Sequence, residues 1–366
     1  MSSVPYRTDA KRLLRSISTG LAALLRQRAT AGGAPRWEAV VAAIALGCAT
    51  AFCVLAVPVL ENKTDFAPIY WSARALLDGV DPYKAVGPQG TYYQLSWPQL
   101  YPLPAILLVL PFAKFSHAVA VALFSGVGAA VLAYAVARDG YRRLPVFLSA
   151  ALFVAAMLGQ WSPVLTAAAM TSTLGFLFVV KPTIGLALFL YRPSMKAVIG
   201  AGVLVLISLA VMPTWPFEWL ARIREHSPRM IAPVTTFAGP LLLLGALRWK
   251  RPEGRLFLAL ALIPQTLSEY EMLPLFLLAA TLPQALTMAA LTWFSVQLQF
   301  LYVDPGASFH VRHLLMADMN VGLVYLYGLS LLLRRPNEGD SPTLLAAALA
   351  ALRRVRLAPR VRASEA

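Results

Sequence analysis

Cysteine is nearly absent from this sequence, which contains only two, Cys48 and Cys53. Both fall in the first apolar segment, five positions apart, so on one helix they point in different directions. A disulfide framework needs paired cysteines at suitable spacing, and a metal site needs more ligands than these two thiols supply. Neither feature is expected in this protein.

Charge is also scarce, because 13% of the residues are charged against 58% hydrophobic. The mean hydropathy is +0.65. This composition excludes a chain of ordinary soluble domains, in which about a quarter of the residues carry charge. Apolar stretches near the roughly 20 residues that cross a bilayer recur between positions 39 and 333. We therefore expect an all-α polytopic membrane protein.

Acidic residues are outnumbered, with 17 Asp and Glu against 32 Lys and Arg, so the net charge is +15. In a soluble chain this excess would indicate a nucleic-acid partner. Here 14 of the basic residues lie in the two ends of the chain, before position 37 and from Arg334 onward. Their Leu/Ala/Arg patterning is typical of helices on an anionic membrane surface. We expect membrane lipids as partners and no nucleic acid.

A scheme of about ten crossings accounts for the basic residues. It places 24 Lys and Arg against seven Asp and Glu on one side, Lys181 included, and eight against ten on the other. Since cytoplasmic loops collect Lys and Arg, the basic side is predicted to be the cytoplasm. The predicted crossings are 39–60, 116–137, 144–158, 162–180, 196–212, 232–247, 256–267, 270–282, 284–303 and 313–333.

This scheme divides the chain into three parts. Residues 1–36 form a basic cytoplasmic segment, residues 37–334 the transmembrane domain, and residues 335–366 a basic cytoplasmic tail. Two long outer loops are predicted, at 61–115 and 214–231. The first contains too many prolines for a further crossing and is expected to form short interfacial helices.

Asp65 is the leading candidate for chemistry, because it follows the first span directly. Carboxylates in or beside a membrane are costly and are functional candidates by default. The local alternative is an N-cap, in which Asp65 accepts a backbone N–H of the following helix. On the local sequence alone, a cap or a solvated loop is favoured.

The wider pattern changes that balance. The stretch DFAPIYWSARALLDGVDPY at 65–83, followed by YPLPAILL at 101–108, resembles the first outer loop of the C-type (GT-C) glycosyltransferases. The nearest likeness is to the bacterial polyprenol-phosphate-mannose-dependent mannosyltransferases of glycosyltransferase family 87. It continues through Gly159-Gln160, Lys181-Pro182 and the polar cluster before Leu273-Pro274, covering about 60–280.

The chain departs from that family at two places. Only residues 161–180 separate Gly-Gln from Lys-Pro, which is a shorter stretch than usual. Residues 268–271, Ser-Glu-Tyr-Glu, stand where such proteins often carry His or His-Tyr. These departures bear on the substrate more than on the fold.

The resemblance implies an inverting glycosyltransferase that lies in a bacterial inner membrane and acts at its outer face without a cofactor. It would move a hexose, with mannose expected, from a polyprenyl-phosphate donor to a lipid-linked or glycan acceptor of the cell envelope. Asp65 matches the aspartate that serves as catalytic base in such families. One carboxylate suffices for this chemistry, because the phosphate leaves without protonation, whereas glycosidases need two carboxylates.

Positive charge is expected around the donor phosphate, and Arg can bind phosphate bidentately. The alternative for the second outer loop is an amphipathic surface helix whose arginines meet lipid headgroups or Glu218 and Glu225. Lys181 either lines an internal cavity or extends toward the inner headgroups. The predicted phosphate-binding residues are Arg222, Arg224, His226, Arg229 and Lys181.

Further polar and aromatic residues are candidates for binding the sugars. Each also has an ordinary explanation, as a helix cap or as part of an interfacial aromatic belt. The spacing of His310, Arg312, His313 and Asp318 matches no recognised ligand set, so no metal is expected. The predicted substrate-binding residues are Tyr70, Trp71, Gln160, Glu269 and Tyr270.

Two other functions remain open at this point. One is a lipid or small-molecule transporter, and the other is a catalytically silent membrane scaffold of the same fold. A transporter is expected to carry its ionisable residues near the bilayer midplane, whereas the scheme above gathers them at the outer surface.

Overall fold

The computed structural model of the 366-residue chain describes residues 33–57, 64–171, 173–226, 230–304, 306 and 308–339, apart from the side chains of Phe309 and His310. The described part is mostly helical, in agreement with the predicted all-α class. Its strands are the parallel pair β1 (Val86–Gly87) and β2 (Tyr93–Gln94). Most of the basic N-terminal segment 1–36 and of the basic C-terminal tail 335–366 lies outside the described residues.

The helices follow one another closely along the chain. The α-helices are α2 (Arg36–Ala56), α3 (Ala67–Leu77), α4 (Pro82–Ala85), α5 (Leu103–Val109), α6 (His117–Arg138), α7 (Ala150–Leu158), α8 (Ser162–Met170), α9 (Pro182–Tyr191), α10 (Met195–Val211), α11 (Trp215–His226), α12 (Pro252–Leu262), α13 (Leu282–Tyr302), α14 (Phe309–Asn320) and α15 (Leu326–Leu333). The 3₁₀ helices are η2 (Phe112–Lys114), η3 (Leu144–Leu148), η4 (Gly175–Val180), η6 (Pro233–Thr235), η7 (Gly239–Arg248) and η8 (Glu269–Leu278), and a π-helical turn, η9 (Val321–Tyr325), joins α14 to α15.

Some of these helices are long and apolar enough to cross a membrane. In the described part of the chain they are α2, α6 and the continuous segment Val311–Leu333. A fourth is counted if α10 and α11, which are bent by 101°, form one span. These segments identify a membrane protein, while the prediction of about ten crossings is not established, because the other predicted spans correspond to helices that do not meet this length and hydropathy test.

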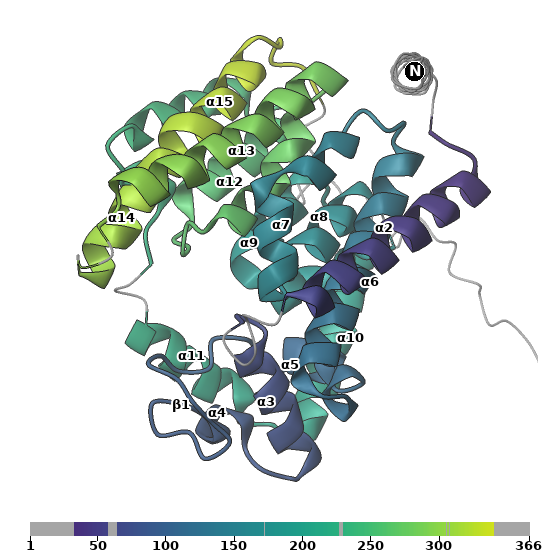
Figure 1. Cartoon of the computed structure of the whole chain (residues 1–366), viewed down its shortest axis with the longest axis vertical. Helices are drawn as coiled ribbons and strands as arrows, with labels where there is room; N and C mark the ends of the chain where they lie inside the picture. The colour runs from purple at the N-terminus through teal and green to yellow at the C-terminus, as the bar shows by residue number, and fades with distance from the viewer. Residues whose placement is uncertain are drawn as a thin grey trace, which may run out of the picture.

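The first two long helices, α2 and α6, lie side by side (Figure 1). Gly47 and Gly126 face each other across their contact: a Cβ on Gly47 would lie 2.8 Å from the Ala130 Cβ, and one on Gly126 would lie 2.9 Å from the Ala51 Cβ. Small residues let membrane helices approach closely, and dispersion contacts between their backbones then stabilise the pair. The apolar helix α2 thus packs closely against α6.

Arginines satisfy backbone carbonyls at the C-terminal ends of several helices. The last carbonyls of a helix have no partner within it, and a cation there also complements the helix dipole. The contacts include Arg143 to Leu277 O (2.9 Å), Arg192 to Met170 O (2.7 Å), Arg248 to Leu333 O (2.8 Å) and Arg255 to Leu190 O (3.0 Å). We call this region, where η8, α8, α15 and α9 end, the basic end.

The first outer loop forms the opposite end of the molecule. Figure 1 shows α3, α4, α5 and α11 gathered there, with α12, α13 and α15 toward the other end of the longest axis. The indole N–H of Trp219 on α11 donates to the carbonyl of Leu100 at 2.8 Å. The buried Gln99 amide donates to the carbonyl of Pro68, the second residue of α3, at 3.0 Å. The short helices expected in this loop are therefore present, and Trp219 connects the loop to α11.

The predicted crossing 162–180 is wrong, because the chain reverses within it. Helix α8 ends at Met170 near the basic end, and η4 then returns to Lys181, whose Nζ lies 3.3 Å from the side-chain oxygen of Gln160. Lys181 therefore lies beside Gln160, and the prediction that these two residues are on opposite sides of the membrane is also wrong. With Lys181 counted on the other side, most Lys and Arg residues still lie on the predicted cytoplasmic side.

The reversal depends on close packing between η4 and α9. A Cβ on Gly185 would lie 1.9 Å from the carbonyl oxygen of Phe178, so a larger residue would push the two segments apart. Gly175 is similarly tight, since its Cβ would lie 2.6 Å from that of Ala197 on α10. These glycines allow three short segments to occupy the space that one long helix was expected to fill.

Candidate functional site

Gly159 positions the two segments that carry the site. It ends α7 with φ of +67°, a conformation in which glycine avoids the strain of a Cβ. A Cβ there would lie 2.6 Å from the Cβ of Phe66, and the backbone N–H of Phe66 donates to the Leu158 carbonyl at 3.0 Å. This approach brings Asp65, the neighbour of Phe66, against Gln160.

Asp65 is half-buried and accepts a hydrogen bond from Gln160 Nε2 at its Oδ2, at 2.7 Å. The N-cap of α3 is Phe66, with no side-chain cap, so Asp65 is not the cap that the local sequence favoured. Burial raises the pKa of Asp65 above its ordinary value, while the charge of Lys181 and hydrogen bonds from Tyr270 and Gln160 act in the opposite direction.

Lys181 joins the second half of the site to the first. Its Nζ lies 3.3 Å from Gln160 Oε1 and 3.4 Å from Glu271 Oε1, and it lies 4.6 Å from the ring centre of Tyr270. The Lys181 side chain is 15% exposed and the Glu271 side chain 3%. We call Asp65, Gln160, Lys181, Tyr270 and Glu271 the Asp65 cluster. The sequence analysis had predicted four of these five as site residues.

Glu271 and its support were missed. Glu271 Oε2 accepts a hydrogen bond from the backbone N–H of Leu267 at 2.7 Å, and Leu267 has a φ of +53°, which is uncommon for a residue with a side chain. The Leu267 carbonyl accepts from Asn320 Nδ2 at 2.8 Å, and Asn320 Oδ1 accepts from Ser295 Oγ at 2.6 Å. The signal for this support is Asn320, a fully buried amide within the apolar segment 313–333.

The other predicted substrate-binding residues are outside these contacts. Glu269 is buried at the start of η8, two positions before Glu271. The hydroxyl of Tyr70 donates to the Phe115 carbonyl at 2.8 Å, and the ring of Trp71 stacks on Tyr93 with centroids 6.4 Å apart. Both aromatic contacts hold the first outer loop together, and the sugar-binding roles of Tyr70, Trp71 and Glu269 stay predictions.

The basic residues of the second outer loop lie mainly on α11. Arg222 donates to the Tyr83 carbonyl at 3.3 Å and lies 3.5 Å from Glu225 Oε2. Arg224 is exposed, and Arg229 lies outside the described residues. The Arg222–Glu225 pair is the contact that the surface-helix alternative anticipates, whereas phosphate binding by this loop stays a prediction.

The remaining candidates are scattered. His226 is buried at the end of α11, and Asp318 Oδ1 accepts the backbone N–H of Phe237 at 2.8 Å. The side chain of His310 lies outside the described residues. Among the described residues, no group of three or more His, Cys, Asp or Glu is arranged to hold a metal ion.

The Asp65 cluster combines a proton acceptor with a cation. A raised pKa makes the Asp65 carboxylate a stronger proton acceptor than an ordinary aspartate, provided that it is ionised. Lys181 supplies positive charge two hydrogen-bonding steps away. This pairing suits a reaction in which a hydroxyl loses a proton while an anion departs. Searches against protein-family models, curated proteins and solved structures each found no match to this chain.

Proposed function

We propose that this protein is an inverting membrane glycosyltransferase of C-type that transfers a hexose from a polyprenyl-phosphate donor to a hydroxyl of a lipid-linked or glycan acceptor. Mannose is the hexose we propose first. The observation that supports this function best is the 2.7 Å contact between Asp65 and Gln160, with Lys181 continuing the same chain of contacts. Segments separated by about a hundred residues thus contribute to one cluster.

In the proposed reaction the acceptor oxygen attacks the anomeric carbon of the donor. The bond between that carbon and the phosphate oxygen breaks, and its electron pair leaves with the polyprenyl phosphate. Asp65 takes the proton of the attacking hydroxyl. Because attack and departure occur on opposite faces of the sugar, the anomeric configuration inverts.

The surroundings of Asp65 favour this role in two ways. Burial raises its pKa and thereby strengthens it as a base, while Lys181, Gln160 and Tyr270 favour the ionised form that a base requires. Lys181 also brings positive charge toward the phosphate that accumulates negative charge as it leaves. The proposal sets the Asp65 cluster toward the outer face and the basic end toward the cytoplasm.

The test is sugar transfer by the purified protein in detergent, with polyprenyl-phosphate mannose and a lipid acceptor. Asp65→Asn should abolish transfer and leave a folded protein, because the amide keeps an acceptor oxygen but does not take up the proton. Asp78→Asn is the matched control, since Asp78 lies in the same loop and its Oδ2 accepts from the Tyr92 hydroxyl at the surface. Transfer at the native rate by the Asp65→Asn variant would contradict the proposal.

One observation favours a transporter as the second candidate. Helices α8 and α9 are short, nine and ten residues, and both begin beside the Asp65 cluster. At 1.5 Å per residue they separate the cluster from the basic end by only about 15 Å, half the thickness of a bilayer core. Broken helices that end at mid-depth are typical of transporters. Flux of a lipid or small molecule into proteoliposomes, with no sugar transfer by the same protein in detergent, would favour this candidate.

A further inference from the structure

Two buried hydrogen-bonding groups beside the Asp65 cluster lack a partner. Trp161 and Ser162 follow Gln160 directly and are 4% and 0% exposed. Within the part of the chain that the structure describes, neither the indole N–H of Trp161 nor the hydroxyl of Ser162 has a hydrogen-bond partner. Buried polar groups are nearly always hydrogen-bonded in native proteins, so an unpartnered pair of this kind points to a ligand.

These two residues stand at the beginning of a helix, and a second helix begins next to them. Ser162 is the first residue of α8, and Lys181 is the N-cap of α9. The 3.3 Å contact between Lys181 and Gln160 brings the two N-termini together. Neither has a side-chain cap. Each N-terminus acts as roughly half a positive charge and presents backbone N–H groups, which together favour an anion.

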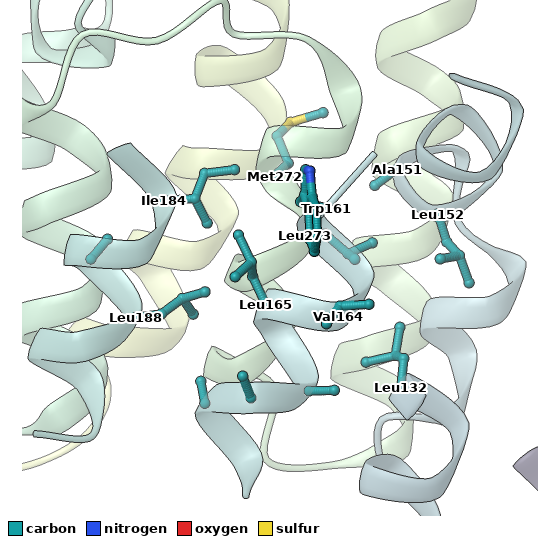
Figure 2. Packing of buried hydrophobic residues seen from close by; sticks show 14 of the residues in the cluster. Leu132, Ala151, Leu152, Trp161, Val164, Leu165, Ile184, Leu188, Met272 and Leu273 are labelled. Carbon is teal, nitrogen blue, oxygen red and sulfur yellow. The ribbon is translucent and has the colours of Figure 1, made fainter. Parts of the chain in front are cut away.

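The side chain of Trp161 is aimed toward this region. Its ring packs edge-on against Phe124, with centroids 4.9 Å apart, which fixes the orientation of the indole. In Figure 2 the ring nitrogen lies on the side away from Val164 and Leu165, toward Met272, the residue that follows Glu271. The unpartnered N–H therefore points toward the end of α8 where the Asp65 cluster lies.

A ligand can reach the N-termini of α8 and α9 from the surface, and Lys181 offers it a hydrogen-bond donor there. Pro182 is exposed, and Asp65 and Lys181 are half-buried, so the cluster reaches the surface beside the two N-termini. An ammonium group has three N–H donors, and Gln160 and Glu271 account for two of them. The third donor of Lys181 can serve a bound anion without breaking either contact.

We propose that the N-termini of α8 and α9, together with Trp161 Nε1, Ser162 Oγ and Lys181, bind the phosphate group of a polyprenyl phosphate. We call this the α8/α9 phosphate site. It rests on the proposed function for the identity of the lipid, and it assigns the phosphate to this site instead of to the arginines of α11. An indole N–H is a donor only, which matches phosphate oxygens that act as acceptors.

The test is direct binding to the purified full-length protein in detergent, followed through the ligand-induced rise in unfolding temperature. The probes are polyprenyl phosphate, the uncharged polyprenol and inorganic phosphate. Polyprenyl phosphate should bind, polyprenol should not, and inorganic phosphate should bind more weakly and compete. Trp161→Phe and Ser162→Ala should each weaken lipid-phosphate binding by about tenfold, as expected for one hydrogen bond to a charged group.

The unligated protein gives a second readout that a merely structural role would not produce. Ser162→Ala removes only an unpartnered buried hydroxyl and should leave the unfolding temperature unchanged or raise it. Trp161→Phe also removes buried ring volume, so its unfolding temperature is compared with that of a variant that loses the same volume. Trp215→Phe is the matched control for the indole, since Trp215 is 5% exposed and its N–H also lacks a partner among the described residues. Ser208→Ala is the control for the hydroxyl, which donates to the Leu204 carbonyl. Both controls should bind polyprenyl phosphate as the native protein does.

Three results would overturn the α8/α9 phosphate site. The first is native affinity in Trp161→Phe and Ser162→Ala together with weakened binding in Arg222→Ala, which would place the phosphate on α11. The second is no binding of polyprenyl phosphate at all. The third is inorganic phosphate binding as tightly as the lipid. Sugar transfer, tested separately with Asp65→Asn, would show whether the proposed function fails as well.

Discussion

The Lys181 ammonium lies 3.4 Å from Glu271 Oε1, and the other oxygen of Glu271 accepts the backbone N–H of Leu267 at 2.7 Å. The carboxylate is thus held from both sides, and its side chain is 3% exposed. Because Leu267 is fixed in turn by Asn320, the position of Lys181 depends on a buried framework that reaches back to α13 and α14. The cation of the site is therefore placed by the late part of the chain.

Glu271→Gln should lower the free energy of unfolding by about 3–5 kcal/mol, because it leaves Lys181 as a nearly buried charge without its counter-charge. Adding Lys181→Met should restore most of the loss, since the double variant contains neither charge. Denaturation titrations of the single and double variants in detergent measure this coupling. Lys84→Met, which breaks the exposed pair with Asp81, should change stability little. Additive losses in the double variant would show that the pair is not coupled.

Gln160→Leu should move the acidic limb of the kcat/KM profile to higher pH. The hydrogen bond from Gln160 lowers the pKa of Asp65, which burial has already raised above 3.8, so removing that bond raises the pKa further. The base is then protonated, and inactive, at a higher pH. Transfer rates measured across the acidic range test this shift. An unmoved limb with a uniformly lower rate would mean that Gln160 binds substrate only.

Asp65→Asn should stabilise the protein at neutral pH. The folded-state pKa of Asp65 is raised above 3.8, so its contribution to stability is present below that pH and is lost as the pH rises through the folded pKa. The amide has no such loss. The variant and the native protein should therefore differ in unfolding free energy by an amount that grows as the pH rises through this window. A pH-independent difference would contradict the raised pKa.

Gly159→Ala should destabilise the protein and displace Asp65. A residue with a Cβ costs about 1–2 kcal/mol at φ of +67°, and here the Cβ would also lie 2.6 Å from that of Phe66. Gly79→Ala is the control, because Gly79 has φ of +73° with no atom within 4 Å of its Cβ position. Denaturation of both variants separates the two effects. Equal losses would mean that the contact with Phe66 yields easily.

Four of the five members of the Asp65 cluster were predictable, whereas Glu271 and the arrangement of the cluster were not. Asp65, Gln160, Lys181 and Tyr270 stand out because they interrupt apolar sequence beside predicted helix ends. The reversal inside 162–180 leaves a weaker mark, the uncharged polar run Thr171-Ser172-Thr173 between two apolar stretches. Hydropathy averaged over a whole span passes over three such residues and does not register a change of direction.

The choice between Glu269 and Glu271 shows the same limit. On a 3₁₀ helix of three residues per turn, side chains two positions apart point about 120° away from each other around the axis, so only one of these carboxylates can face Lys181. Which one it is depends on the packing of η8 against α8 and α7. Sequence spacing alone does not contain that information.

Two positions test the direction in which the protein crosses the membrane. The scheme predicts that α11 is outside and that the basic end is in the cytoplasm, because cytoplasmic loops collect Lys and Arg. Ala221 on α11 and Lys250 near the basic end are both exposed, so a cysteine at either should be reactive.

The native cysteines, which are exposed on α2, are first replaced in a Cys48→Ala, Cys53→Ala background. An impermeant thiol reagent added to intact cells should then label Ala221→Cys and not Lys250→Cys, and permeabilised cells should show labelling at both. The reverse pattern would turn the Asp65 cluster toward the cytoplasm, where a polyprenyl-phosphate sugar presented at the outer face would not reach it.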